Sequence, residues 1–168
     1  MQADLDVLAA CASDSSVCSP VSSRFLAIVE AGRERQGRAR LGTVNRAINL
    51  SIQITSDITQ HGVPDLWSSP LETFMSGKGD CEDYAIAKFT ALLLAGVPDE
   101  DLRILIVDNA RTRQVHAVVA ARTDGRWLIL DNRRLMLVKR RDLLLRRAHV
   151  SCRWQGSARV SSCTWSQH

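Results

Sequence analysis

The chain has 168 residues, a length at which one domain buries roughly two-thirds of the surface that its unfolded form would expose. Hydrophobic residues make up 45% and charged residues 24%, which excludes wholesale disorder and predicts a globular core. No apolar run approaches the roughly 18 residues that a bilayer-crossing helix requires, so we expect no membrane span.

The net charge of +4 comes from the C-terminal end of the chain. Residues 133–168 contain nine Lys or Arg and one acid, Asp142, which leaves 13 basic against 17 acidic residues before them. Such a segment can meet phosphates, acidic lipids or acidic proteins, but a solvated surface is the simpler interpretation. Residues 133–149 have no aromatic side chains to stack on bases, so we expect no nucleic-acid partner. We expect one domain at residues 1–150 and a divergent basic Ser- and Arg-rich tail at residues 151–168.

Cysteine spacing argues against a structural zinc site, because none of the five cysteines forms a C-x2-C pair. Cys11 and Cys18 are separated by six residues that include the turn formers at 13–16, so a short disulfide loop fits an oxidising compartment. The alternative is two small buried apolar side chains in a reducing cytosol. Residues 1–18 lack the basic and apolar regions of a secretory signal, which is typical of a mature form or of a cytosolic protein.

Two helices are expected in the N-terminal third. Ser19 suits an N-cap and Pro20 a first helical position, and apolar spacing continues to about residue 36. A second helix is predicted over residues 42–54. Its Asn45 and Asn49 we interpret as a polar face rather than as a binding site. Its apolar stripe comprises Val44, Ile48 and Ile52.

A short helix and a long buried helix follow. After turn residues at 61–65, Ser69-Pro70 begins a helix that ends near Gly77. Asp80 is then a good N-cap, and residues 84–94 are apolar almost all round until a glycine stops the helix. Cys81 therefore lies in the first turn of a buried helix.

Strand periodicity appears only in the second half of the chain. After a connection at 98–101, strands are predicted at 102–107, 115–122 and 126–130, and residues 134–145 suit a further strand and a short turn. Helices first and sheet second predict an α+β fold with one antiparallel sheet.

The segment Thr-Asp-Gly at residues 123–125 predicts a three-residue hairpin loop that pairs Arg122 with Arg126. This register puts His116 opposite Asn132, next to Asp131. Within one residue of slippage, either Asp131 or Asn132 reaches the imidazole.

Cys81, His116 and Asp131 offer the three roles of a nucleophilic triad. A helix N-terminus favours a thiolate, a histidine can act as general base, and a carboxylate can orient that histidine. Taken singly, Cys81 reads as a buried structural cysteine and His116 as a satisfied core histidine. Their common context, at a helix start and on neighbouring strands, favours catalysis.

Three carboxylates surround the cysteine. Asp80, Glu82 and Asp83 would raise the pKa of the thiol if left without a counter-charge. Three oxygen-bearing side chains within four residues suit a hard cation, above all Ca²⁺. The alternative is that Asp80 caps the helix while the other two are surface acids favoured by the helix dipole.

The sequence resembles the bacterial transglutaminase-like cysteine proteinases over roughly residues 41–142. The most specific segment is GDCEDYAIAK at residues 79–88. Further matching segments lie at residues 44–49, 67–74, 102–104, 115–119 and 128–132. Beyond Asp142, the Arg-rich tail has no counterpart in the family pattern.

This resemblance implies a papain/transglutaminase-like fold with Cys81 as nucleophile, His116 as base and Asp131 as its orienting partner. In the LapG-type branch of the family, it implies that the carboxylates matching Asp80, Glu82 and Asp83 bind the calcium that activity requires. It further implies a periplasmic or secreted protease that cuts a large surface adhesin. An inner-membrane cyclic-di-GMP receptor that sequesters the protease is the implied partner.

Two alternatives remain open from the sequence. The same triad could pass the acyl group to an amine instead of water, which would make the protein a transglutaminase-type acyl transferase. A catalytically inactive calcium-binding interaction module, docked through the basic tail, is the rival from another class.

Overall fold

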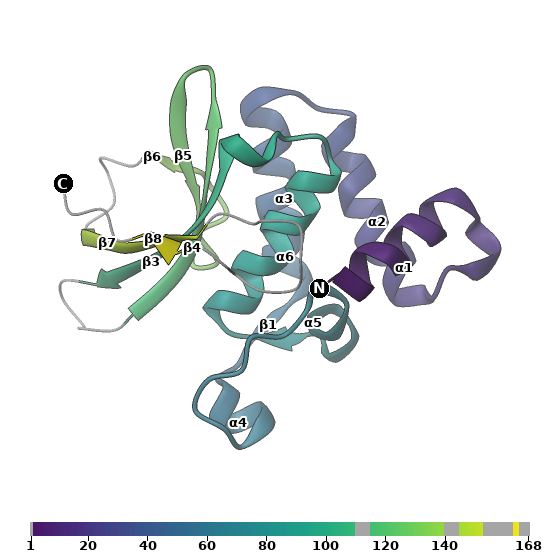
Figure 1. The fold of residues 1–168 in the computed structure, drawn as a ribbon, viewed down its shortest axis with the longest axis horizontal. Coiled ribbons are helices and arrows are strands. Elements are labelled where there is room, and N and C mark those ends of the chain that lie inside the picture. Colours follow the sequence, from purple (N-terminus) through teal and green to yellow (C-terminus); the bar gives the residue numbers. More distant parts are fainter. Residues whose placement is uncertain (1, 110–114, 140–144, 153–162, 165–168) are drawn as a thin grey trace.

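Helices form one side of the molecule and a six-stranded antiparallel sheet forms the other (Figure 1). The computed structural model describes residues 2–109, 115–139, 145–152 and 163–164. The expected α+β order, with helices first and sheet second, is confirmed. The basic tail expected at residues 151–168 lies largely outside the described residues.

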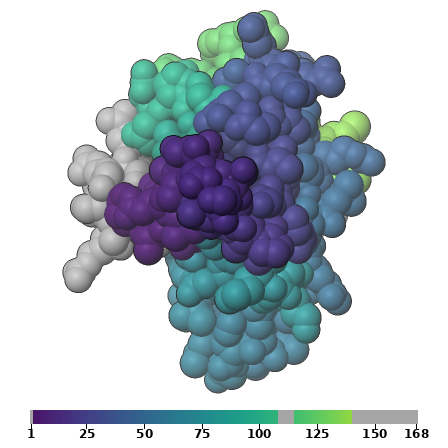
Figure 2. All heavy atoms as spheres, turned by 90° about the vertical axis from the view of Figure 1, so that its right-hand side faces the viewer, coloured from purple at the N-terminus to yellow at the C-terminus, as the bar shows by residue number. Residues whose placement is uncertain are grey.

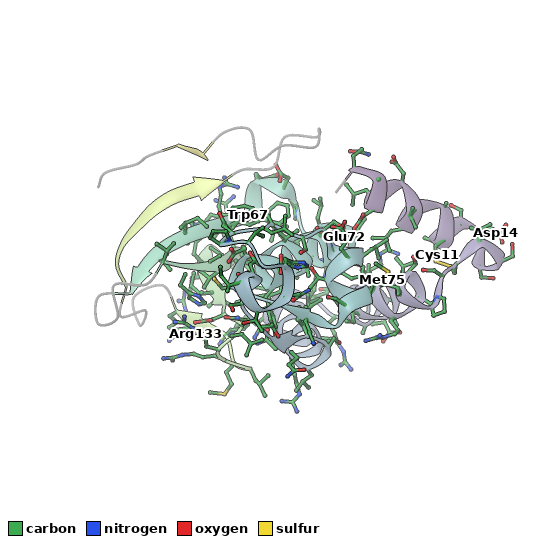
Figure 3. All side chains as sticks on the ribbon, turned by 90° about the horizontal axis from the view of Figure 1, so that it is seen from below. Cys11, Asp14, Trp67, Glu72, Met75 and Arg133 are labelled. Atoms are coloured by element: carbon green, nitrogen blue, oxygen red, sulfur yellow. A yellow bond between two sulfur atoms is a disulfide. The ribbon has the colours of Figure 1, made fainter. Side chains whose placement is uncertain are left out.

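A disulfide closes the N-terminal segment. It joins Cys11 in α1 (Gln2–Ser13) to Cys18, directly after η1 (Ser15–Val17). Of the two alternatives for these cysteines, the oxidised loop is confirmed. Cys11 lies at the end of the molecule far from the sheet (Figure 3), and this segment stands out from the surface of the helical side (Figure 2).

The second and third helices confirm two expectations and correct their bounds. The helix α2 (Pro20–Arg33) begins as predicted, with Ser19 as N-cap, whereas α3 (Gly37–Ser51) begins five residues before the predicted start. Gly37 has a φ of 52°, which turns the chain between the helices, so the break falls there.

The face of α3 that carries Asn45 and Asn49 is polar, as expected, but another part of the chain covers it. Asn45 is fully buried, and both side chains donate hydrogen bonds to the backbone that follows strand β5 (Arg126–Leu130). A helical period identifies which residues share a face, but it does not show which element covers that face.

The segment between α3 and the nucleophile contains small elements. The two-residue strands β1 (Gln53–Ile54) and β2 (Lys78–Gly79) pair in parallel, and between them lie α4 (Asp57–His61) and α5 (Pro70–Ser76). The predicted helix start at Ser69-Pro70 and its end at Gly77 are confirmed. The helix α4 and the two short strands were not predicted; α4 extends from the main body in Figure 1.

The central element is α6 (Cys81–Leu94), which lies between the helices α2 and α3 and the sheet (Figure 1). Every residue from Asp83 to Leu92 is buried, as its apolar composition on all faces predicts. At its other end, the Arg33 guanidinium donates two hydrogen bonds to the Leu94 carbonyl at 3.0 and 2.8 Å. Because both sides of α6 are covered, the position of its first turn is fixed by the core.

The large sheet has the strand order β6-β5-β4-β3-β7-β8, and every neighbouring pair is antiparallel. The first of its strands in chain order, β3, follows η2 (Asp99–Asp101). One face packs on α6, and the other carries a small apolar cluster around Ile129. The strands are β3 (Leu102–Asn109), β4 (Val115–Thr123), β5 (Arg126–Leu130), β6 (Val138–Lys139), β7 (Leu145–Cys152) and β8 (Cys163–Thr164).

The hairpin between β4 and β5 differs from its predicted register by one residue. Thr123 pairs with Arg126, so the loop has two residues, Asp124 and Gly125, with φ values of 51° and 68°. Positive φ at both loop positions matches the right-handed twist of the flanking strands, which explains why the Asp-Gly pair forms the shorter turn.

None of the helices in the described part of the chain combines the length and the hydropathy needed to cross a bilayer.

Candidate active site

The Cys81 thiol lies between the start of α6 and strand β4. Cys81 is the first residue of α6, directly after the N-cap residue Asp80. The backbone amide of Ala117 in β4 donates toward the sulfur, and the thiol donates to Oε2 of Glu82 at 3.0 Å. The predicted position in the first helical turn is thus confirmed, and the sulfur lies beside the strand that carries His116.

Without a counter-charge, this environment opposes ionisation of the thiol. Burial raises the pKa of Cys81 to about 12, and the hydrogen bond and negative charge of Glu82 act in the same direction. The Ala117 amide lowers the pKa but does not offset the other contributions. Of the three sequence-adjacent acids, Glu82 and Asp80 therefore have the inhibitory effect expected of them, after the larger effect of burial.

His116 and Asp131 form a buried pair. Nε2 of His116 and Oδ1 of Asp131 lie 2.9 Å apart, and the two residues are 2% and 6% exposed. Burial alone would raise the pKa of Asp131, but the hydrogen bonds from His116 and from the Arg133 amide outweigh it and hold the pKa below its ordinary value. Asp131 is therefore an ionised carboxylate, and of the two candidates in the sequence it is the one that meets the imidazole.

The other ring nitrogen of His116 is available. Nδ1 is buried and has no hydrogen-bond partner among the described residues. Because Nε2 is directed at Asp131, Nδ1 is the atom that remains to exchange a proton with another group.

A buried lysine lies behind this pair. Lys88, two turns along α6 from Cys81, is 1% exposed, and its Nζ lies 5.7 Å from the centroid of the Tyr84 ring. Burial lowers the pKa of Lys88 to about 7, although the Asp131 carboxylate attracts the cation and opposes that effect. Lys88 was not singled out in the sequence, where it read as one polar position of an apolar helix.

We expect Lys88→Met to raise the free energy of unfolding at pH 6.5, because burial penalises the charged ammonium group and the substitution removes that penalty. The folded-state pKa lies below that of the unfolded chain, so the charged form is penalised in the fold. This penalty is complete below about pH 7 and is relieved as the pH rises toward the unfolded value of 10.5. Denaturant unfolding at pH 6.5 and pH 10 measures the gain, which should shrink at the higher pH. The exposed Lys78→Met is the matched control; an equal gain there would contradict the assignment.

Two further acids join the three that the sequence indicated. Oxygens of Asp57, Asp80 and Asp83 lie within 4.8 Å of one another, and a second such group comprises Asp57, Asp65 and Glu82. Asp57 is the first residue of α4, and Asp65 lies in the loop that follows this helix. The cluster therefore joins the α4 segment to the start of α6. Sequence reasoning missed both residues because it recognised the segment around them only as turn chemistry.

Burial and mutual repulsion oppose the ionisation of this cluster. Burial, followed by the neighbouring Glu82, raises the pKa of Asp80 to about 7, and burial with Asp80 and Asp57 nearby raises the pKa of Asp83 to about 6. Oδ1 of Asp57 and Oδ1 of Asp80 are buried without a hydrogen-bond partner among the described residues. An oxygen-only set with unpartnered buried oxygens fits a hard cation, and Ca²⁺ in particular.

The same carboxylates hold the α4 segment against α6. The Asp83 carboxylate accepts hydrogen bonds from the Ser68 amide at 2.8 Å and from the Asp80 amide at 3.3 Å, and Asp57 accepts one from the Leu66 amide. The indole of Trp67, which is labelled in Figure 3, donates to Asp65 at 3.2 Å. A cation bound here would therefore contact both α6 and the loop that precedes α5.

The chain belongs to the family of bacterial transglutaminase-like cysteine proteinases, whose model it matches over residues 3–143. LapG of Legionella pneumophila is similar, with 25% identity and a TM-score of 0.69, over 88% of this chain and 82% of that one. The calcium-bound form of that LapG gives 25% identity and a TM-score of 0.68 over the same shares of the two chains. An EGTA-treated form gives 24% identity and a TM-score of 0.70 over 97% of this chain and 90% of that one.

The wider fold class is also shown. A putative cysteine protease from Cytophaga hutchinsonii shares 17% identity and a TM-score of 0.50 over 68% of this chain and 41% of that one, a likeness of fold alone. No curated protein matches the chain. The papain/transglutaminase-like α+β fold is confirmed, and family and fold together are those of a cysteine protease, an enzyme that acts on proteins.

Proposed function

We propose that this protein is a calcium-dependent cysteine endopeptidase with Cys81 as nucleophile, His116 as general base and Asp131 as the residue that orients His116. The observation that carries the proposal is the buried hydrogen bond between His116 and Asp131, beside a cysteine at a helix N-terminus. An inactive binding module would gain nothing from a buried imidazole whose Nδ1 has no hydrogen-bond partner in the described part of the chain.

The chemistry follows from these positions. His116 accepts the proton of the Cys81 thiol at Nδ1, and the sulfur bonds to the carbonyl carbon of the scissile peptide. Backbone amides at the start of α6 stabilise the oxyanion. The C–N bond breaks as His116 passes its proton to the leaving amine. Water then attacks the thioester carbonyl carbon and gives one proton to His116. The C–S bond breaks, the new carboxyl group leaves, and His116 returns the proton to the Cys81 sulfur.

For the metal, we propose that Asp80, Glu82 and Asp83, together with Asp57 and Asp65, hold Ca²⁺. A bound divalent cation supplies positive charge that offsets the carboxylates around Cys81. Support comes from the unpartnered buried oxygens of this cluster and from the similarity to a LapG structure that is calcium-bound.

We propose that the substrate is a large bacterial surface adhesin and that the enzyme works in the periplasm or outside the cell. The Cys11–Cys18 disulfide supports an oxidising compartment. The proposed partner is an inner-membrane cyclic-di-GMP receptor. This proposal rests on the family resemblance carried by residues 79–88. We also propose that residues 1–150 form one catalytic domain.

Incubation with purified surface proteins tests the activity. Fragments should form with the wild type in calcium, and should be absent with Cys81→Ala or after chelation with EGTA. Mass spectrometry of the new C-termini in the presence of an added amine separates the two acyl-transfer outcomes: a free carboxylate indicates hydrolysis and an amide indicates transamidation. Identical fragments from Cys81→Ala would contradict the proposal.

A further inference from the structure

The turn that carries Asp131 is held by two amide side chains of α3. Nδ2 of Asn49 donates to the carbonyls of Asp131 and Arg134, both at 2.9 Å. Nδ2 of Asn45 donates to the carbonyls of Arg134 and Leu135 at 3.0 and 3.2 Å. The two asparagines, four residues apart on one helix face, therefore contact the backbone on both sides of this turn.

Sheet pairing does not fix Asp131 directly. The ladder between β4 and β5 ends at Val119 and Leu130, one residue before Asp131, and β6 pairs only with Leu128 and Ile129. Beyond that point the turn has its own short contacts, from the Arg133 amide to the Asp131 carboxylate and from the Arg134 amide to the Asp131 carbonyl. Among the described residues, α3 supplies the remaining hydrogen bonds to this backbone.

The asparagines are costly for a purely structural contact. Oδ1 of each is buried and has no hydrogen-bond partner among the described residues. Asn45 as a whole is 0% exposed. An unpartnered buried acceptor destabilises a fold, but an apolar residue of the same size would leave the carbonyls of the turn without these donors. The amides therefore supply hydrogen bonds to this turn that apolar packing cannot supply.

We infer that Asn49, assisted by Asn45, is a positioning residue that holds the backbone of Asp131 so that its carboxylate meets Nε2 of His116. This inference rests on the proposed function and deepens it. With Asp131 in place, the neutral imidazole carries its hydrogen on Nε2, and Nδ1 is left as the base. When the turn is released, both tautomers become accessible, and the fraction of His116 competent to accept a proton from Cys81 falls.

The test uses Asn49→Leu, which keeps the side-chain volume and removes the donor. Ile48→Val is the matched control, because it weakens the core one position away without touching the turn. The first readout is the tautomer of His116 from its ring ¹⁵N shifts. The second is the rate of alkylation of Cys81 in calcium. We expect a single Nε2–H tautomer in the wild type and in Ile48→Val. In Asn49→Leu we expect a tautomer mixture and a rate lower by roughly 10- to 100-fold.

A double substitution isolates the route of the effect. In an Asp131→Asn background, Asn49→Leu should slow alkylation by less than twofold, because a residue that acts through Asp131 has nothing left to position. An unchanged tautomer in Asn49→Leu, or a full loss of rate in both backgrounds, would overturn the inference. Where leucine prevents folding, Asn49→Ser gives the same comparison. A wild type whose alkylation is independent of His116 would instead overturn the proposed function, while the tautomer still decides the positioning role.

Discussion

Replacement of His116 by alanine should slow the alkylation of Cys81 by iodoacetamide by roughly 10²- to 10⁴-fold at pH 7 in the presence of calcium. The reason is that burial and Glu82 oppose ionisation of this thiol, so a neighbouring base is needed to take its proton. The modification is measured by mass spectrometry on the tryptic peptide of residues 79–88, which separates Cys81 from the other cysteines. Protease activity should fall at least as far.

Two further variants test whether the slower alkylation comes from the loss of His116 as a base. Asp131→Asn should also slow alkylation, because a neutral amide can present a donor to Nε2 and select the wrong tautomer. His61→Ala removes an exposed histidine at the end of α4 and should leave the rate unchanged. If Cys81 in the calcium-loaded wild type reacts no faster than a free peptide thiol, the nucleophile assignment fails.

Removal of calcium should abolish activity and lower the melting temperature. At a calcium concentration of 100 times the Kd, binding stabilises the folded state by about 2.7 kcal/mol, which corresponds to a melting temperature higher by about 5–10 °C for a chain of this size. Differential scanning calorimetry after treatment with EGTA, and again after calcium is restored, measures both directions of the change.

The calcium effect should grow with pH. The folded-state pKa values of Asp80 and Asp83, about 7 and about 6, lie above the ordinary aspartate value, so the metal-free fold holds protons that the unfolded chain releases. The stability that these groups give the metal-free protein is therefore complete below the ordinary aspartate pKa of 3.8 and is lost as the pH rises from there through 6 to 7. Calcium competes with the same protons. The rise in melting temperature on adding calcium should be small at pH 5 and large at pH 8.

Substitutions in the acidic cluster separate the metal from general charge effects. Glu82→Gln and Asp65→Asn should each reduce the calcium-dependent rise in melting temperature, whereas Asp6→Asn, an exposed acid on α1, should leave it intact. Equal behaviour of all three variants, or full activity after thorough chelation, would exclude the proposed site.

The sequence predicted the parts of this protein whose signals are local. The N-caps at Ser19 and Ser69, the buried helix that begins at Cys81 and the three central strands each depend on spacing within about ten residues, and each was confirmed. The family resemblance rested on a continuous decapeptide at residues 79–88, which is also a local signal.

The missed features are those that depend on contacts between distant segments. Asp57 and Asp65 reach the acidic cluster because β1 pairs with β2, a two-residue strand contact that no periodicity can show. The place of β7 beside β3 depends on the same kind of pairing. The hairpin error was different: the Asp-Gly turn signal was visible, but a three-residue loop was chosen over the two-residue one.

Because α6 is enclosed by apolar side chains, the whole interior contributes to the position of Cys81, the proposed nucleophile. A helix covered on both sides can neither slide nor rotate without disrupting its packing. The position of the Cys81 thiol therefore depends on side chains as remote as Leu92, about three turns along the helix. We expect that substitutions in the core that shift α6 slightly lower the rate of the proposed reaction before they unfold the protein.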